Sequence, residues 1–242
     1  MNDNYTIPQQ NIESVDTSLT YCLRNGWQKL WKYFLEMLLI LIISFLLSLP
    51  ELGIYIDSLK DIVSNFISIN LILINVKGFG AYIVFAIAYT ILFSDPMEYG
   101  VQYAFLKVAR NEKVEVKDMF FFTKNFWNTV FAYFLTDVII VVGCLFCLVP
   151  GIILACKLAF VSYLVVDKRM DAVEAIKESW RMTRGHSYTV FVIGLLAIFI
   201  YIGGFILCGI GIILSTMWVK LAFASLYHAV DTLESKKTST AV

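Results

Sequence analysis

The sequence predicts an all-α integral membrane protein, a six-helix bundle built from three helical hairpins that are each preceded by a cytoplasmic amphipathic helix. Three observations lead to this class. Apolar residues make up 59% of the 242 positions and charged residues only 16%, whereas soluble domains have about 45–50% and about 25%. The apolar residues occur in blocks long enough to cross a bilayer. The basic residues lie almost entirely in the two tails and in every second segment between the blocks, which would place them on one side of the membrane.

Six apolar blocks predict the membrane spans. We expect them near Tyr33–Leu49, Phe79–Ser94, Trp127–Val149, Gly151–Val166, Tyr188–Leu207 and Gly211–Val230. Several are shorter than the usual ~20 residues, which flanking Trp, Tyr and Lys side chains compensate by anchoring at the interface. The spans form one membrane domain over residues 15–231, between disordered tails at residues 1–14 and 232–242.

The segment 51–78 does not read as a further span. Its second half is apolar but carries several Ser and Asn residues, a mixture that suits an extracytoplasmic or re-entrant helix. The sequence leaves open whether this insertion is interfacial, re-entrant or spanning. A seventh span would move every later segment to the other side of the membrane, against the charge distribution described next.

The positions of Lys and Arg predict the orientation, because basic residues resist translocation. Fifteen of the nineteen lie in the N-terminal flank, in the segments 95–126 and 167–187, and in the C-terminal tail. Only Lys60 and Lys77 lie on the opposite side, and Lys157 and Lys220 fall within spans. Both termini are therefore expected in the cytoplasm.

An internal repeat predicts the three hairpins. At an offset of 100 residues the chain matches itself at Trp27 and Trp127, at Tyr33 and Tyr133, and at Pro50 and Pro150, with a weaker third copy from His186 to Gly209. Each copy places 23 residues between the entry ring and the outer turn, a rise of about 35 Å as helix. Residues 19–34 and 171–184 carry apolar side chains at steps of three and four, which predicts amphipathic helices before the first and third hairpins.

The region from Leu19 to Val230 resembles the membrane domain that is fused to some bacterial glycerophosphoryl diester phosphodiesterases, and a large set of uncharacterised bacterial multi-pass proteins made of such a domain alone. The resemblance is carried by the stretch 104–114 and by Pro150, Gly151, Phe160, Tyr163, Asp167, Trp180, Arg184, Gly185 and His186. It implies the hairpin fold and a bacterial cytoplasmic (inner) membrane. It implies no enzyme activity, because in those fusions the chemistry belongs to a separate soluble domain.

Charged residues inside the spans are the first candidate site. Such residues cost at least ~2.5 kcal/mol and usually face a partner or water. The candidates for a buried ion cluster are Glu36, Asp137, Lys157 and Lys220. Counting from the outer turns places Asp137 and Lys220 at depths that allow them to pair. A structural ion pair and a proton- or ion-coupled path both remain open.

The helix at 171–184 is the second candidate site. Its basic residues beside an anionic inner leaflet predict a lipid or partner surface formed by Lys177, Trp180, Arg181 and Arg184. No catalytic motif, metal-ligand spacing or phosphate loop is present, so we expect no enzyme, metal or cofactor, and the absence of nucleic-acid signatures argues against nucleic acid as a partner.

We therefore expect a non-enzymatic membrane protein that organises lipids or a partner complex, the partner being another membrane protein or a second copy. The alternative is a transporter or channel component that uses Asp137, Lys157 and Lys220. A lipid-acting intramembrane enzyme is a more distant third reading.

Overall fold

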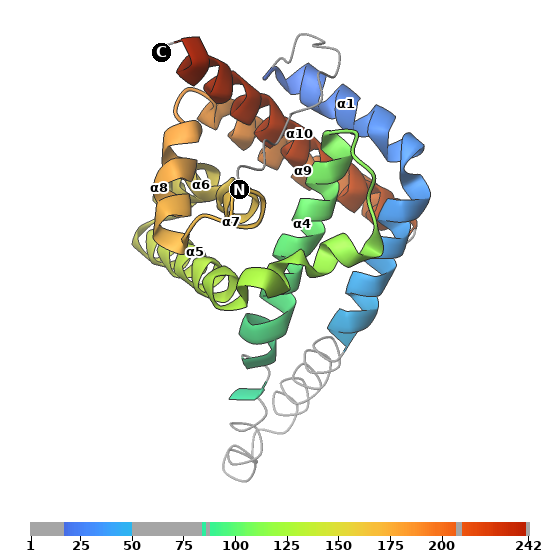
Figure 1. Cartoon of the computed structure of the whole chain (residues 1–242), viewed down its shortest axis with the longest axis horizontal. Helices are drawn as coiled ribbons and strands as arrows, with labels where there is room; N and C mark the ends of the chain where they lie inside the picture. Colours follow the sequence, from blue (N-terminus) through green and yellow to red (C-terminus); the bar gives the residue numbers. More distant parts are fainter. Residues whose placement is uncertain (1–16, 50–83, 86–87, 207–209, 241–242) are drawn as a thin grey trace, which may run out of the picture.

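The computed structural model describes residues 17–49, 84–85, 88–206 and 210–240 (Figure 1). Within these ranges every regular element is helical, so the all-α class is confirmed. Four helical segments are long and apolar enough to cross a membrane: Phe126–Phe146, Val149–Asp167, Ser187–Ile206 and Gly211–Lys236. A fifth arises if the bent pair Leu19–Lys32 and Phe34–Leu49 is counted as one span. The insertion at 51–78 and the first half of the expected second span lie outside the described residues.

Helix α1 (Leu19–Lys32) is the expected amphipathic helix before the first apolar helix. The Ser18 hydroxyl accepts a hydrogen bond from the Tyr21 backbone N–H at 3.4 Å and so caps its start. At Tyr33 the chain bends by 89° into the apolar helix Phe34–Leu49. This change of direction separates a helix with a polar face from one that is apolar over most of its length.

Helix α1 lies along α10 (Ile210–Thr240), and a glycine lets the two backbones approach closely. A Cβ added at Gly26 would lie 3.3 Å from the Ala222 backbone nitrogen. Two polar contacts fix the crossing: the Trp218 indole N–H donates to the Leu23 carbonyl at 3.0 Å, and the Asn25 side-chain amide donates to the Ser225 hydroxyl at 3.1 Å. The N-terminal amphipathic helix is therefore an integral part of the bundle.

The second span differs from its prediction, which ended it at Ser94. A π-helical turn, η1 (Thr90–Ser94), leads directly into α4 (Asp95–Ala109). Helix α4 packs against α10, α7, α5 and α1, and in Figure 1 it lies near the middle of the molecule. The sequence predicts residues 95–126 as a cytoplasmic segment between two spans. In the fold, Asp95 and Glu98 lie on a central helix whose other side chains form much of the core.

Helix α5 (Phe126–Phe146) follows a 3-10 helix, η2 (Val116–Asn125), and packs against α6 (Leu148–Leu158), which continues into α7 (Val161–Asp167). The turn is an extended residue, Cys147, just before the predicted Pro150–Gly151 breaker. A Cβ added at Gly151 would lie 3.0 Å from the Cys144 Cα atom. This glycine therefore permits the close packing of α5 on α6.

Helix α9 (Ser187–Ile206) follows the amphipathic helix α8 (Ala172–Met182) and packs against α10. Gly185, at φ +88°, ends the α8 segment as its sequence position predicted. Helix α10 runs to Thr240, past the point at which the sequence predicted a disordered tail from residue 232. The ion pair between Glu234 and Arg181 of α8 ties this extension to the bundle.

Two adjacent glycines of α9 allow a matched test of the α9–α10 contact. A Cβ at Gly204 would lie 2.7 Å from the Gly211 carbonyl oxygen and would also meet the Ser215 hydroxyl, whereas a Cβ at Gly203 has nothing within 4 Å. We expect Gly204→Ala to destabilise the protein by about 1–3 kcal/mol, because a backbone atom cannot move aside. Gly203→Ala should be neutral or slightly stabilising.

Thermal unfolding in a mild detergent, followed by fluorescence or by size exclusion after heating, measures both variants. Equal melting temperatures for Gly203→Ala and Gly204→Ala would contradict the close approach of α9 and α10.

Candidate functional site

The four residues of the predicted ion cluster do not form one cluster. Glu36 is exposed near the start of the helix Phe34–Leu49, and Asp137 is exposed in the middle of α5. Lys157 lies at the end of α6 and Lys220 lies on α10. Each is at a different place on the bundle, so we describe them separately.

Lys220 forms an ion pair with Glu98 of α4, not with Asp137 as the depths along the chain suggested. The side chain of Lys220 is 17% exposed and that of Glu98 is 38% exposed. The pairing differs from the prediction because α4 continues through the bundle and brings Glu98 to the depth of Lys220. The sequence predicts Glu98 to lie between two spans, so Glu98 was not among the candidate partners of Lys220.

Asp137 accepts no hydrogen bond and forms no ion pair within the described part of the chain. It lies near the middle of the 21-residue helix α5, about 16 Å from the start of that helix at 1.5 Å per residue. Its neighbours on the exposed side of α5 are apolar, among them Phe134, Val138 and Val141. Asp137 is therefore a charged residue on an apolar helix face without a polar partner among the described residues.

Lys157 lies where the fourth span is broken. Helix α6 ends at Leu158 and α7 begins at Val161. The ammonium donates a hydrogen bond to the Ser187 hydroxyl at the start of α9, at 2.7 Å, and lies 5.9 Å from the centre of the Trp180 ring. Lys157 has no acidic partner among the described residues.

Helix α8 satisfies the backbone groups that this break leaves without helical partners. The Ser179 hydroxyl donates to the Lys157 carbonyl at 2.8 Å and accepts from the Phe160 N–H at 3.2 Å. Ser179 and Thr183 are both fully buried. An interrupted helix is tolerated at membrane depth only where its free polar groups are satisfied by other protein groups. The amphipathic helix α8 therefore packs against the break, and its small polar side chains form hydrogen bonds with the backbone groups that the break leaves free.

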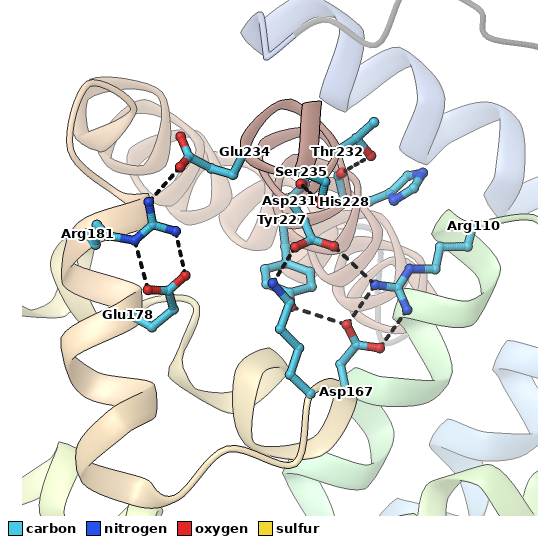
Figure 2. Close-up of polar contacts among 11 residues, drawn as sticks. Arg110, Asp167, Glu178, Arg181, Tyr227, His228, Asp231, Thr232, Glu234 and Ser235 are labelled. Atoms are coloured by element: carbon cyan, nitrogen blue, oxygen red, sulfur yellow. Dashed lines mark hydrogen bonds and ion pairs between the residues drawn. The ribbon is translucent and has the colours of Figure 1, made fainter. Parts of the chain in front are cut away.

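A second polar cluster joins the ends of α4, α7 and α10 (Figure 2). The Arg110 guanidinium donates two hydrogen bonds to the Asp167 carboxylate, at 2.6 and 2.7 Å. The same guanidinium lies 3.7 Å from Asp231, which forms an ion pair with Lys168 at 2.6 Å. The Tyr227 hydroxyl donates to Asp167 at 3.2 Å. We call these five residues the end cluster: Arg110, Asp167, Lys168, Tyr227 and Asp231.

The end cluster has the electrostatics of a structural clamp. Burial lowers the pKa of Arg110, but the hydrogen bonds and the charge of Asp167 outweigh it, so the net pKa is raised. The guanidinium therefore stays charged at every physiological pH. Bidentate contacts of this kind are among the strongest hydrogen bonds in proteins. The cluster holds three helices that are far apart in sequence at one end of the bundle.

The predicted basic surface on α8 is partly neutralised. Arg181 forms ion pairs with Glu178 and with Glu234 of α10, both at 2.7 Å, and Figure 2 shows this group beside the end cluster. The hydrogen bonds from Arg181 lower the pKa of the Glu178 carboxyl. Lys177 and Arg184 are exposed and have no acidic partner in the described part. Trp180 is half-exposed and lies over Lys157.

Sequence reasoning missed the end cluster and Glu98. Asp167 and Arg110 were noted only within the stretches that carry the family resemblance. A signal for Glu98 exists in the sequence, because the apolar spacing continues from Met97 through Val108 on either side of it. The contact between Arg110 and Asp167, which are 57 residues apart, cannot be predicted from a single sequence.

Comparison with known proteins finds a similarity over less than half of the chain. Residues 128–239 match the sequence model of a domain of unknown function (DUF7847). No curated protein and no solved structure matches the chain. The matched range begins in the first turn of α5 and extends into the last turn of α10. It gives no link to phosphodiesterase membrane domains, so that resemblance stays a prediction, and the matched segment is similar to a domain whose function is unassigned.

Proposed function

We propose that the chain is a non-enzymatic integral membrane protein that organises a partner complex, with its associated lipids, in a bacterial cytoplasmic membrane. The spans would be arranged as three hairpins with both termini inside. The basic residues support this orientation, because those of the end cluster and of α8 gather where α4, α7 and the C-terminal half of α10 meet. The family resemblance of the sequence supports a membrane domain without enzyme activity of its own.

The exposed carboxylate of Asp137 is the observation that carries the proposal. An Asp at the centre of a membrane helix costs about 2.5–3.5 kcal/mol on insertion scales, and such residues nearly always face other protein groups or water. Asp137 has no partner in the described part of its own chain. The face of α5 that bears Asp137 is therefore the proposed contact with another membrane protein or with a second copy of the chain.

The contact can be tested with a photo-crosslinking residue in place of Val141, one helical turn from Asp137 on the exposed side of α5. We expect a crosslinked protein product in native membranes, and its loss when Asp137→Leu is added. The mass of the product distinguishes a second copy from another protein. Because the carboxylate makes no contact within the chain, Asp137→Leu should leave the thermal stability of the isolated protein unchanged or higher.

The matched control carries the crosslinker in place of Ile198, which is equally exposed on α9 (56% for both side chains). This position should give lipid adducts without a protein product. A protein product at Val141 that survives Asp137→Leu would contradict the role of the carboxylate. Equal protein products at Val141 and Ile198 would contradict α5 as the contact face.

A transporter or channel component is the second candidate, and the Glu98–Lys220 pair favours it. The pair lies on α4 and α10, twelve and eleven residues from Arg110 and Asp231 of the end cluster. These separations correspond to about 16–18 Å of helix, a depth at which charged residues often mark ion pathways. We rank this reading second because the surrounding core is apolar.

The residues Lys177, Trp180, Arg181 and Arg184 of α8 remain a proposed lipid or partner surface. Its basic charge is reduced to Lys177 and Arg184, since Arg181 is held by Glu178 and Glu234. Each free basic group beside an anionic leaflet contributes about 1 kcal/mol. This surface would supplement the α5 face and would not replace it.

A further inference from the structure

A groove of about 390 Å³ lies between α6 and α9. Its volume is within the ~300–1,000 Å³ range of small-molecule sites. Apart from Lys157 and Ser187, the groove is lined by apolar and aromatic side chains: Val149, Ile152, Ile153, Cys156, Tyr188 and Phe191. Val149 and Lys157 are eight residues apart on α6, which is about 12 Å of helix. The groove is therefore elongated and its surface is almost wholly apolar, with Lys157 as the only charged residue among those that line it.

The cation is located at the end of the groove where α9 begins. Lys157 donates to the Ser187 hydroxyl, and Ser187 is the first residue of α9. The positive end of the α9 dipole therefore lies beside the ammonium. In the described part of the chain, Lys220 has Glu98 and Lys168 has Asp231, whereas Lys157 has only the neutral hydroxyl and the Trp180 ring. Lys157 is therefore a cation without an acidic partner among the described residues, and unlike the exposed Lys177 and Arg184 it lines a groove.

We propose that this groove binds one anionic phospholipid, with an acyl chain along α6 and α9 and the phosphate on Lys157. The apolar walls select a lipid over a soluble anion, because a soluble anion would leave them without a partner. The two helices are candidate spans with exposed apolar faces, so the groove opens toward the bilayer. In the proposed orientation, the start of α9 lies at the inner interface, where anionic headgroups are found.

This site rests on the proposed membrane placement of the chain and not on the α5 contact face. It uses α6 and α9, and none of its residues lies on α5. Failure of the crosslinking experiment at Val141 would leave the lipid site standing, and failure of the lipid experiment would leave the α5 contact standing.

The test uses the full-length protein in a mild detergent, mixed with phosphatidylglycerol or with phosphatidylcholine of identical acyl chains. Native mass spectrometry counts the retained lipid. We expect the wild-type protein to prefer one phosphatidylglycerol, and Lys157→Gln to weaken its binding about tenfold while phosphatidylcholine is unaffected. A charged hydrogen bond of ordinary strength accounts for a change of this size. The matched control is Lys113→Gln, an exposed lysine just after α4 that belongs to neither proposed binding surface, which should change neither lipid.

A second pair of variants tests the groove itself. Ile153→Trp fills it and should remove the tightly bound lipid of either headgroup, whereas Ile198→Trp on the exposed side of α9 outside the lining residues should not. An unchanged preference for phosphatidylglycerol in Lys157→Gln would overturn the proposal. So would displacement of the lipid by glycerol 3-phosphate at an equal concentration, because the site would then recognise a free anion.

Discussion

Arg110→Met and Asp167→Leu are each expected to destabilise the protein by about 3–5 kcal/mol, while the double variant should lose much less than the sum of the two. Each single change leaves the remaining member of the pair buried without its main partner, since the two side chains are only 21% and 12% exposed. Removing one partner of a buried pair is costly for this reason, and replacing both with apolar residues is often close to neutral. The remaining pair, Lys168 and Asp231, keeps part of the end cluster in place.

Unfolding in mixed micelles, followed by circular dichroism over a denaturant series, gives the free energies for this double-mutant cycle. The control is Lys117→Met, whose ion pair with Glu115 has 76% and 60% exposed side chains and should contribute less than ~1 kcal/mol. Additive losses for Arg110→Met and Asp167→Leu would show that the two residues do not act as a pair. The clamp between α4 and α7 would then lie elsewhere.

The largest effect inside the membrane is expected for the Glu98–Lys220 pair. Lys220→Met leaves the Glu98 carboxylate without its cation, and Glu98→Leu leaves the ammonium without its anion, each at a cost of at least ~2.5 kcal/mol. The double variant Glu98→Leu with Lys220→Met should recover most of this loss. Asp137→Leu with Lys220→Met should instead be additive, because Asp137 does not contact Lys220.

The same variants separate the two proposed functions. In proteoliposomes with an imposed pH gradient, the partner-organising protein should show no proton flux above that of empty vesicles. A transporter should show flux that is lost in Glu98→Gln. Flux of this kind would reverse our ranking of the two functions. Coupling of Asp137 to Lys220, with none between Glu98 and Lys220, would restore the pairing that the sequence predicted and reject the one seen in the structure.

Helix type and approximate position were predictable because they depend on local composition. The apolar blocks that form α5, α6 with α7, and α9 are each long enough to cross a bilayer. A soluble protein of this size would not contain so many apolar segments of this length. Breaker residues located the turns approximately: Gly185 follows α8, and the turn after α5 falls at Cys147, three residues before Pro150, which itself lies inside α6. The amphipathic faces of α1 and α8 were likewise visible as a period of 3.6 residues.

The partner of Glu98 and the end of α10 were not predictable from the local pattern. The apolar spacing around Glu98 is compatible with a helix, but the ion pair that accommodates its charge comes from Lys220, 122 residues away. The C-terminal turns of α10 look like a polar tail and are fixed by the ion pair from Glu234 to Arg181. In both cases a tertiary contact, and not the local preference, decides the outcome.

The sequence by itself determined that this chain is built of apolar helices that can cross a membrane, since hydrophobic length and charge spacing are properties of single segments. Only the tertiary structure decided which charges meet. In the structure Lys220 forms an ion pair with Glu98, and Arg110 forms one with Asp167. Asp137 and Lys157 have no acidic partner in the described part of the chain. The physical reason is that an ion pair depends on distances between side chains of different helices, and these follow from how the helices cross and not from their order.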